Sequence, residues 1–274
     1  PAPPPEQRWA PPPAAAPPAD RRAHDPYPPD GRQSIDLGSV IQGTINTITS
    51  HAGLMLLFAF LLGGLPAAIF SLFSSAGGST SSTSGAAVLF GFFIVMPLYL
   101  AATIMLQAIV TRITIEGAGG QRAPVGDLFS GALAILFPLL GLMVLMSLAI
   151  GLGLVLLIVP GVILMCMWVV AAPALIAERS SVTAALDRSR RLTEGARWPI
   201  FGLLLIYVVG VIVLQIPSAL VTQAGLGWTA AFVINMIVST ITGLVFPTLM
   251  AVLYVELRRV KEGAVPGAFA EIFR

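Results

Sequence analysis

The chain has 274 residues, of which 56% are hydrophobic and only 10% are charged. Soluble domains usually carry about 25% charged residues, so this composition excludes an ordinary water-soluble core. The formal net charge of +2 is too small to favour nucleic-acid binding. Cys166 is the one cysteine, which rules out an intrachain disulfide and a cysteine metal cluster.

The charged residues are confined to four blocks, which are separated by three long apolar runs. Every Asp, Glu, Lys and Arg lies in 1–36, 112–127, 178–197 or 256–274. A bilayer core is about 30 Å thick and a helix crosses it in about 20 residues, so each run is long enough for two crossings. The sequence therefore predicts an all-α membrane protein with six transmembrane helices.

The chain divides into a polar segment and a membrane domain. Residues 1–33 hold 12 of the 22 prolines and no apolar stretch that resembles a signal peptide. Such a composition cannot bury enough apolar surface to offset the entropy of ordering, so we expect a disordered tail. Residues 34–274 form the membrane domain, with spans expected at about 52–73, 87–111, 132–157, 161–177, 199–222 and 230–255.

The connections follow from charged and helix-breaking residues. We expect Arg112 to end the second span and the glycine-rich segment 112–127 to be irregular. Pro160 and Gly161 are expected to form the turn inside 128–177, because a single helix of that length would far exceed the bilayer.

Two further segments have the amphipathic pattern of helices that lie in the membrane interface. The first is 34–49, with Ser34 as the expected N-cap, and the second is 181–193. A short terminal helix is expected at 267–273. Three times, an amphipathic segment leads into a helical hairpin, over 34–111, 123–177 and 181–255. This pattern fits either a threefold repeat or the ordinary alternation of a six-span protein.

Lysine and arginine set the orientation. The four charged blocks hold 4, 2, 5 and 4 of the 15 basic residues, and the three opposite loops hold none. Positive residues near span ends stay on the cytoplasmic side. Six spans with both termini in the cytoplasm place every basic block on the cytoplasmic side. The expected location is the bacterial cytoplasmic, or inner, membrane.

The span interiors offer little catalytic chemistry. They contain no Asp, Glu, Lys or Arg, although such groups mark most proton and ion pathways. Common hydrolase, nucleotide-binding and zinc motifs are absent, and His51 has no acid near it in sequence. We expect no enzyme activity, no metal site and no cofactor. A membrane enzyme that acts on lipid headgroups, with His51 at its centre, is the weakest alternative.

Uncharged polar residues in the last two spans suggest another function. If the protein is a transporter or channel for a small neutral or lipidic solute, the expected path is lined by Gln215, Asn235, Ser239, Thr240 and Thr242. Such side chains are more often used for hydrogen bonds between membrane helices.

Basic residues are concentrated just before the fifth span and just after the sixth span. They are candidate contacts for anionic lipid headgroups, each contributing about 1 kcal/mol: Arg179, Arg188, Arg190, Arg191, Arg197, Arg258, Arg259 and Lys261. Glu178, at the end of the fourth span, is expected to pair with Arg188 or Arg191 and to dock the helix 181–193. Asp187 and Arg191 are also spaced to pair.

Several short segments carry a resemblance to a known family. They are Pro160 to Leu164, Ala184 to Ser189, Leu192 to Gly195, Tyr254 to Arg258 and Lys261 to Gly263, with Pro173 and Glu178 between them. Together they resemble the glycerophosphoryl diester phosphodiesterase membrane-domain family, bacterial multi-span proteins of mostly unknown role. The resemblance covers about residues 35–274.

This resemblance implies a membrane domain rather than an activity. In some relatives the domain precedes a soluble barrel that hydrolyses glycerophosphodiesters and carries its own catalytic residues. The 274 residues do not include that barrel, so no catalytic residue is carried over. We therefore expect a non-enzymatic scaffold, accessory or lipid-interacting factor. Its expected partners are the bilayer and anionic phospholipid headgroups, with no nucleic acid, and the sequence identifies no protein partner.

Overall fold

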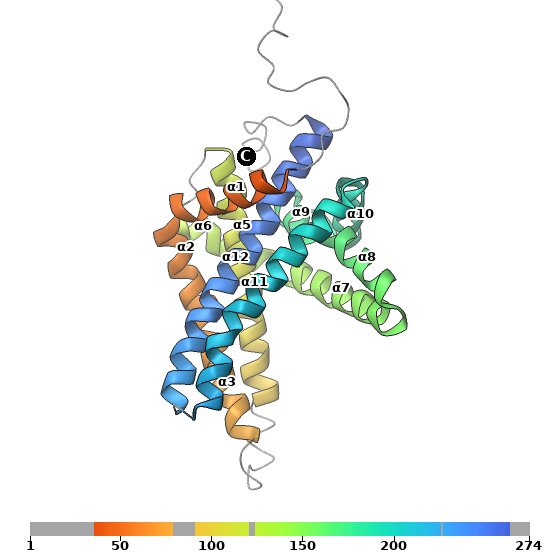
Figure 1. Cartoon of the computed structure of the whole chain (residues 1–274). Coiled ribbons are helices and arrows are strands. Elements are labelled where there is room, and N and C mark those ends of the chain that lie inside the picture. The colour runs from red at the N-terminus through yellow and green to blue at the C-terminus, as the bar shows by residue number, and fades with distance from the viewer. Residues whose placement is uncertain (1–35, 79–90, 121–123, 226, 264–274) are drawn as a thin grey trace, which may run out of the picture. The chain divides into compact units, whose positions relative to one another are not determined.

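The computed structural model describes residues 36–78, 91–120, 124–225 and 227–263, and these ranges are helical and contain no strand (Figure 1). The two labels η2 and η3 mark short π-helical turns. The elements are α1 (Leu37–Ser50), α2 (Ala52–Phe58), η2 (Ala59–Gly64), α3 (Leu65–Gly78), η3 (Gly91–Val95), α5 (Met96–Ala118), α6 (Val125–Ala134), α7 (Leu136–Leu156), α8 (Ile158–Trp168), α9 (Ala171–Glu178), α10 (Val182–Thr193), α11 (Arg197–Gln223) and α12 (Trp228–Glu262).

Six helical stretches in the described ranges are long and apolar enough to cross a membrane, which confirms the fold class expected from the sequence. They are Ala52–Ser71, Phe93–Ala118, Leu136–Leu156, Ile158–Glu178, Arg197–Val221 and Trp228–Glu262. Each expected span overlaps one of them. The chain is therefore a multi-pass membrane protein.

Helix α12 is the central element of residues 34–274. It packs against α1, η2, α3, α5 and α11, and its side chains Leu253, Tyr254 and Leu257 are fully buried. In Figure 1, α3, α5, α11 and α12 run side by side, whereas the α7–α8 hairpin leaves this group at an angle. Helix α7 is the least buried of the six spans, and Val155 near the tip of the hairpin is 85% exposed. Apolar surface of this kind is stable in contact with lipid tails.

The prediction that the second span ends at Arg112 is wrong, and so is the prediction of an irregular loop over 112–127. Helix α5 continues to Ala118 and α6 begins at Val125. Arg112 is tolerated inside the helix because its charge is neutralised one turn later by Glu116, with 3.0 Å between the guanidinium and the carboxylate. An arginine near a span end therefore does not always terminate the helix.

The expected turn at Pro160 and Gly161 is also wrong. The chain turns at Leu157, which has extended backbone angles, and Pro160 lies in the first turn of α8. Proline is compatible with a first helical turn because the N–H that it lacks has no partner there. Gly161 instead allows close packing, since a Cβ atom on it would lie 2.7 Å from the backbone nitrogen of Leu154.

A short helix precedes each of the three hairpins: α1, α6 and α10. The N-cap of α1 is Asp36, whose carboxylate accepts a hydrogen bond from Gly38 N–H at 3.0 Å, rather than the expected Ser34. An aspartate at this position complements the positive end of the helix dipole. The expected tail 1–33 and the expected helix 267–273 lie outside the described residues.

Gly64 permits the close approach of η2 and α12. A Cβ atom there would overlap Thr240 Oγ1 and lie 2.8 Å from the backbone oxygen of Met236. We expect Gly64→Ala to lower the free energy of unfolding by about 2 kcal/mol, the usual cost of overpacking. The matched control is Gly53→Ala, because a Cβ atom on Gly53 meets nothing within 4 Å. Unfolding of both variants in detergent, followed by circular dichroism, checks this; equal stability of the two would contradict it.

Candidate functional site

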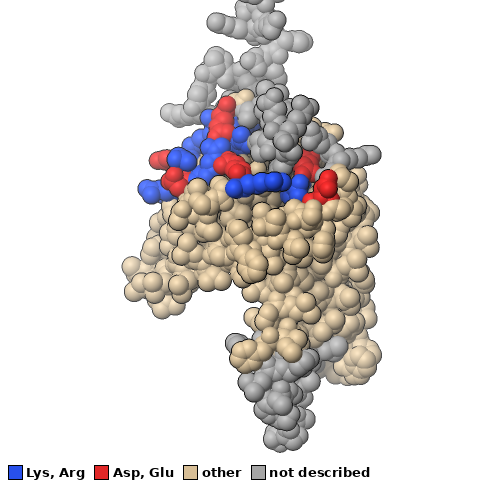
Figure 2. All heavy atoms as spheres, turned by 180° about the vertical axis from the view of Figure 1, so that it is seen from behind, with Lys and Arg blue, Asp and Glu red and all other residues tan. Residues whose placement is uncertain are grey.

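The charged side chains gather at one end of the membrane domain, and the remaining visible surface is uncharged (Figure 2). Helix α10 lies at this end. Ser181 caps it by accepting a hydrogen bond from Ala184 N–H at 3.3 Å. Its apolar face, which includes Ala185 and Leu192, is buried, while Arg190 and Arg191 on the other face are exposed. The sequence pattern of 181–193 therefore produces the expected amphipathic helix.

Helix α10 is docked into a break in the fourth span. The chain leaves helical geometry between Trp168, the last residue of α8, and Ala171, the first of α9. Carbonyl groups at the end of a helix lack an intrahelical partner. The Met167 carbonyl accepts hydrogen bonds from the hydroxyls of Ser189, at 2.9 Å, and Thr193, at 3.2 Å. Both hydroxyl side chains are fully buried.

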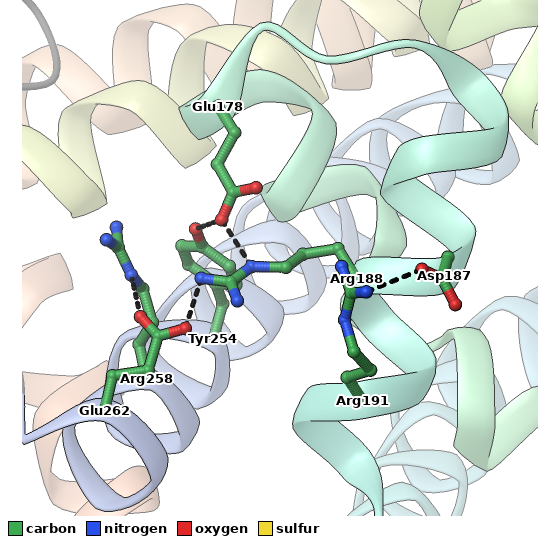
Figure 3. Close-up of polar contacts among 7 residues, drawn as sticks. All are labelled: Glu178, Asp187, Arg188, Arg191, Tyr254, Arg258 and Glu262. Atoms are coloured by element: carbon green, nitrogen blue, oxygen red, sulfur yellow. Dashed lines mark hydrogen bonds and ion pairs between the residues drawn. The ribbon is translucent and has the colours of Figure 1, made fainter.

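A network of five side chains joins α9, α10 and α12 (Figure 3). Arg188 Nε donates to Glu178 Oε1 at 2.7 Å, and Tyr254 Oη donates to the same oxygen at 2.9 Å. The Arg188 NH2 group lies 2.5 Å from Glu262 Oε1. Arg258 Nε donates to Glu262 Oε2 at 2.8 Å. Arg188 thus bridges two carboxylates, one at the end of α9 and one at the end of α12.

The network holds Arg188 in its charged form. Burial alone would lower the pKa of its guanidinium, but the hydrogen bonds and charges of Glu178 and Glu262 outweigh burial and raise that pKa. A partly buried arginine that satisfies two carboxylates is geometrically fixed. The expected pair of Glu178 and Arg188 is therefore present as a contact, and its position between α9 and α10 suits the docking role suggested by the sequence.

The other candidate basic residues lie nearer the surface. Arg191 pairs with Asp187 at 2.9 Å, and both side chains are more than half exposed. Lys261 Nζ donates to the Glu194 carbonyl at 2.6 Å, while Arg259 lies 3.9 Å from Glu256. Arg179, Arg190 and Arg197 are exposed, and no ion pair joins them to another residue within the described ranges.

Two of the five residues of the expected transport path, Ser239 and Thr242, line one polar cavity among the spans. Gln215 is exposed on α11, where its side-chain oxygen accepts a hydrogen bond from Ser218 at 3.2 Å. Thr240 donates to the Met236 carbonyl at 2.7 Å, within α12. Ser239 and Thr242 line a cavity of about 260 Å³, but Gln215, Asn235 and Thr240 do not.

Sequence reasoning missed Tyr254 and Glu262 at the charged end, and it predicted Arg258 as a lipid contact rather than as a member of the network. Tyr254, Arg258 and Glu262 follow one another at intervals of four, which places them on one face of a helix and is the signal that would have grouped them. No comparable signal predicts the Met167 carbonyl as the partner of Ser189 and Thr193, because that contact depends on the break in the fourth span.

A buried ion pair was also missed. Arg112 and Glu116 are almost fully buried, and Arg112 also donates to the Asp127 carbonyl at 2.9 Å. This contact joins the end of α5 to the start of α6. Gly131 makes room for it, since a Cβ atom there would overlap the Arg112 guanidinium.

Within the described part of the chain, no group of three or more His, Cys, Asp or Glu side chains is arranged to hold a metal ion. His51 lies between α1 and α2, and its Nδ1 is 2.9 Å from the Ser50 hydroxyl. No family model, curated protein or solved structure matches the chain.

The network predicts unequal costs for two similar substitutions in α10. We expect Arg188→Gln to lower the free energy of unfolding by about 2 kcal/mol, because it leaves two partly buried carboxylates without their shared cation. Arg191→Gln removes an exposed pair and is expected to cost less than about 0.5 kcal/mol. Thermal unfolding of both variants in the same detergent measures the difference. Equal losses would show that the network does not dock α10.

Proposed function

We propose that the protein is a non-enzymatic membrane factor that holds anionic phospholipid headgroups at its charged end. The proposed location is the bacterial cytoplasmic membrane, with the charged end and both termini on the cytoplasmic side. The basic blocks support this orientation, because positive residues near span ends are retained in the cytoplasm. Anionic lipids of that leaflet are then the natural partners of exposed arginine side chains.

The observation that carries the proposal is that some arginine side chains are paired with carboxylates whereas others are exposed. Arg188 and Arg258 are held by carboxylates inside the network, and Arg188 fixes α10 in place. Arg190, on the outer face of α10, and Arg197, at the start of α11, are exposed. The network thus holds α10, with its exposed Arg190, on a rigid support, and rigidity lowers the entropy lost on binding.

We also propose that the chain is a member of the glycerophosphoryl diester phosphodiesterase membrane-domain family. The support is that motif segments far apart in sequence meet in space: Glu178 and Arg188 contact Tyr254 or Glu262, and Lys261 contacts Glu194. The shared segments then form one structural unit that docks α10. This membership brings no hydrolase activity to the chain.

Lipid retention tests the proposed function. Full-length protein is equilibrated in mild detergent with equal amounts of phosphatidylglycerol and phosphatidylcholine, and the lipid that remains bound is measured by mass spectrometry. We expect the wild type to retain phosphatidylglycerol preferentially. Removing two of the exposed cations, by Arg190→Gln with Arg197→Gln, should lower that retention about thirtyfold, since each headgroup contact contributes about 1 kcal/mol.

A control variant that should change lipid retention in the opposite direction alters the exposed Asp187–Arg191 pair on α10. Asp187→Asn releases Arg191 from its carboxylate partner and should increase retention of phosphatidylglycerol. Equal retention of the two lipids by the wild type, or unchanged retention in the double variant, would overturn the proposal.

A further inference from the structure

A cavity of about 260 Å³ lies among η2, α3, α5, α11 and α12, in the part of the molecule formed by the spans. Its wall combines apolar residues with six side chains that carry polar atoms: Tyr99, Thr103, Gln107, Tyr207, Ser239 and Thr242. None of the described residues that line it is an Asp, Glu, Lys, Arg or His.

Three of these side chains have no hydrogen-bond partner among the described residues: the Gln107 amide and the hydroxyls of Tyr99 and Tyr207. All three side chains are half-buried, and hydrocarbon at the depth of the spans offers no hydrogen bond to a polar group that lacks a partner. Three such groups around one cavity therefore favour a polar guest, either water or a solute, that satisfies them.

The remaining hydroxyl groups define what the guest must supply. Thr103 donates its proton to the Leu100 carbonyl at 2.8 Å, and Thr242 donates to the Val238 carbonyl at 2.9 Å. Ser239 donates to the side-chain oxygen of Asn235 at 3.3 Å. With these protons engaged, the three oxygens remain as acceptors, so the guest must bring several donors of its own.

The aromatic side chains are held in place around these acceptors. The Tyr99 ring stacks on Phe70 with centroids 5.1 Å apart, and the Tyr207 ring lies against Phe246 at 5.0 Å. Both hydroxyl groups are thereby positioned on rigid rings. Because the wall contains no ion, a charged guest would lack a counter-charge, whereas a neutral molecule with several hydroxyl groups meets every requirement.

We propose that this cavity binds a neutral polyol, with Gln107 as the residue that both donates to and accepts from its hydroxyl groups. A second cavity of about 270 Å³, lined almost wholly by apolar side chains, lies between α1, α11 and α12 and shares Tyr207 and Thr242 with the first. It suits an acyl chain. The polyol is therefore either a free solute or the hydroxylated headgroup of a neutral lipid. This inference is independent of the proposed contacts with anionic lipids.

The test uses full-length protein in phosphatidylcholine nanodiscs, with erythritol as the free probe and saturation-transfer NMR as the readout. We expect transfer to erythritol above the level of empty nanodiscs. Loss of one hydrogen-bonding group should lower the transfer about fivefold, both in Gln107→Leu and in Tyr99→Phe, which keeps the stacked ring. The matched control is Gln215→Leu, the same change at an exposed position that does not line the cavity, and it should leave transfer unchanged.

A second arm distinguishes the lipid source. A monoacylglycerol is added to the nanodiscs as a minor component, and the amount retained by the purified protein is measured by mass spectrometry. Retention by the wild type that is lost in Gln107→Leu, together with no erythritol signal, identifies a lipid headgroup as the polyol. The proposal is overturned if neither probe binds the wild type, or if Gln107→Leu and Tyr99→Phe bind the probes as the wild type does. It is also overturned if urea, added as a probe that is not a polyol, binds and neither polyol does.

Discussion

The structure depends on one constraint: an unpaired charge is too costly to leave in the hydrocarbon core of a bilayer. All charged residues that the structure describes lie near span ends or in the short helices between spans, and Figure 2 shows them gathered at one end. Because each apolar run leaves this end and returns to it, the spans come in pairs. The same constraint explains why the charges that do become buried, Arg112 and Glu116, are paired with each other.

Gathering charges at one end creates the site as well as the topology. Helix α10 follows the fourth span directly, and its docking surface is the break between α8 and α9. The hydroxyls of Ser189 and Thr193 satisfy the carbonyl that the break exposes, and Arg188 links the two flanking carboxylates. These polar contacts fix the buried half of α10, and the outer half, with Arg190 and Arg191, is left exposed.

The fold was predictable wherever apolar length decides the outcome. Three apolar runs, each long enough for two crossings, are sufficient to predict six spans, and the amphipathic pattern of 181–193 is sufficient to predict α10. The prediction failed where one residue type has two possible roles. Arg112 was expected to end a helix because its partner Glu116 was not considered, and Pro160 was expected at a turn although it equally suits a first helical turn.

The candidate site was predictable only in part, because its contacts join residues far apart in the chain. Glu178 and Arg188 are ten residues apart and were expected to pair, whereas Tyr254 reaches Glu178 across 76 residues. The lining of the polar cavity was predictable only in part for the same reason. Ser239 and Thr242 were recognised as polar residues of one span, but Gln107 and Tyr99 come from another hairpin, and only the packing of α5 against α12 brings them together.

The most direct test of this account measures on which side of the membrane each of two single cysteines lies in intact bacterial cells. In a Cys166→Ala background, Gln223→Cys lies at the uncharged end of α11, and Arg190→Cys lies on the exposed face of α10. A membrane-impermeant maleimide should label the first in intact cells and the second only after the membrane is permeabilised. Labelling of both from the same side would contradict the account, since the charged and uncharged ends would then share a compartment.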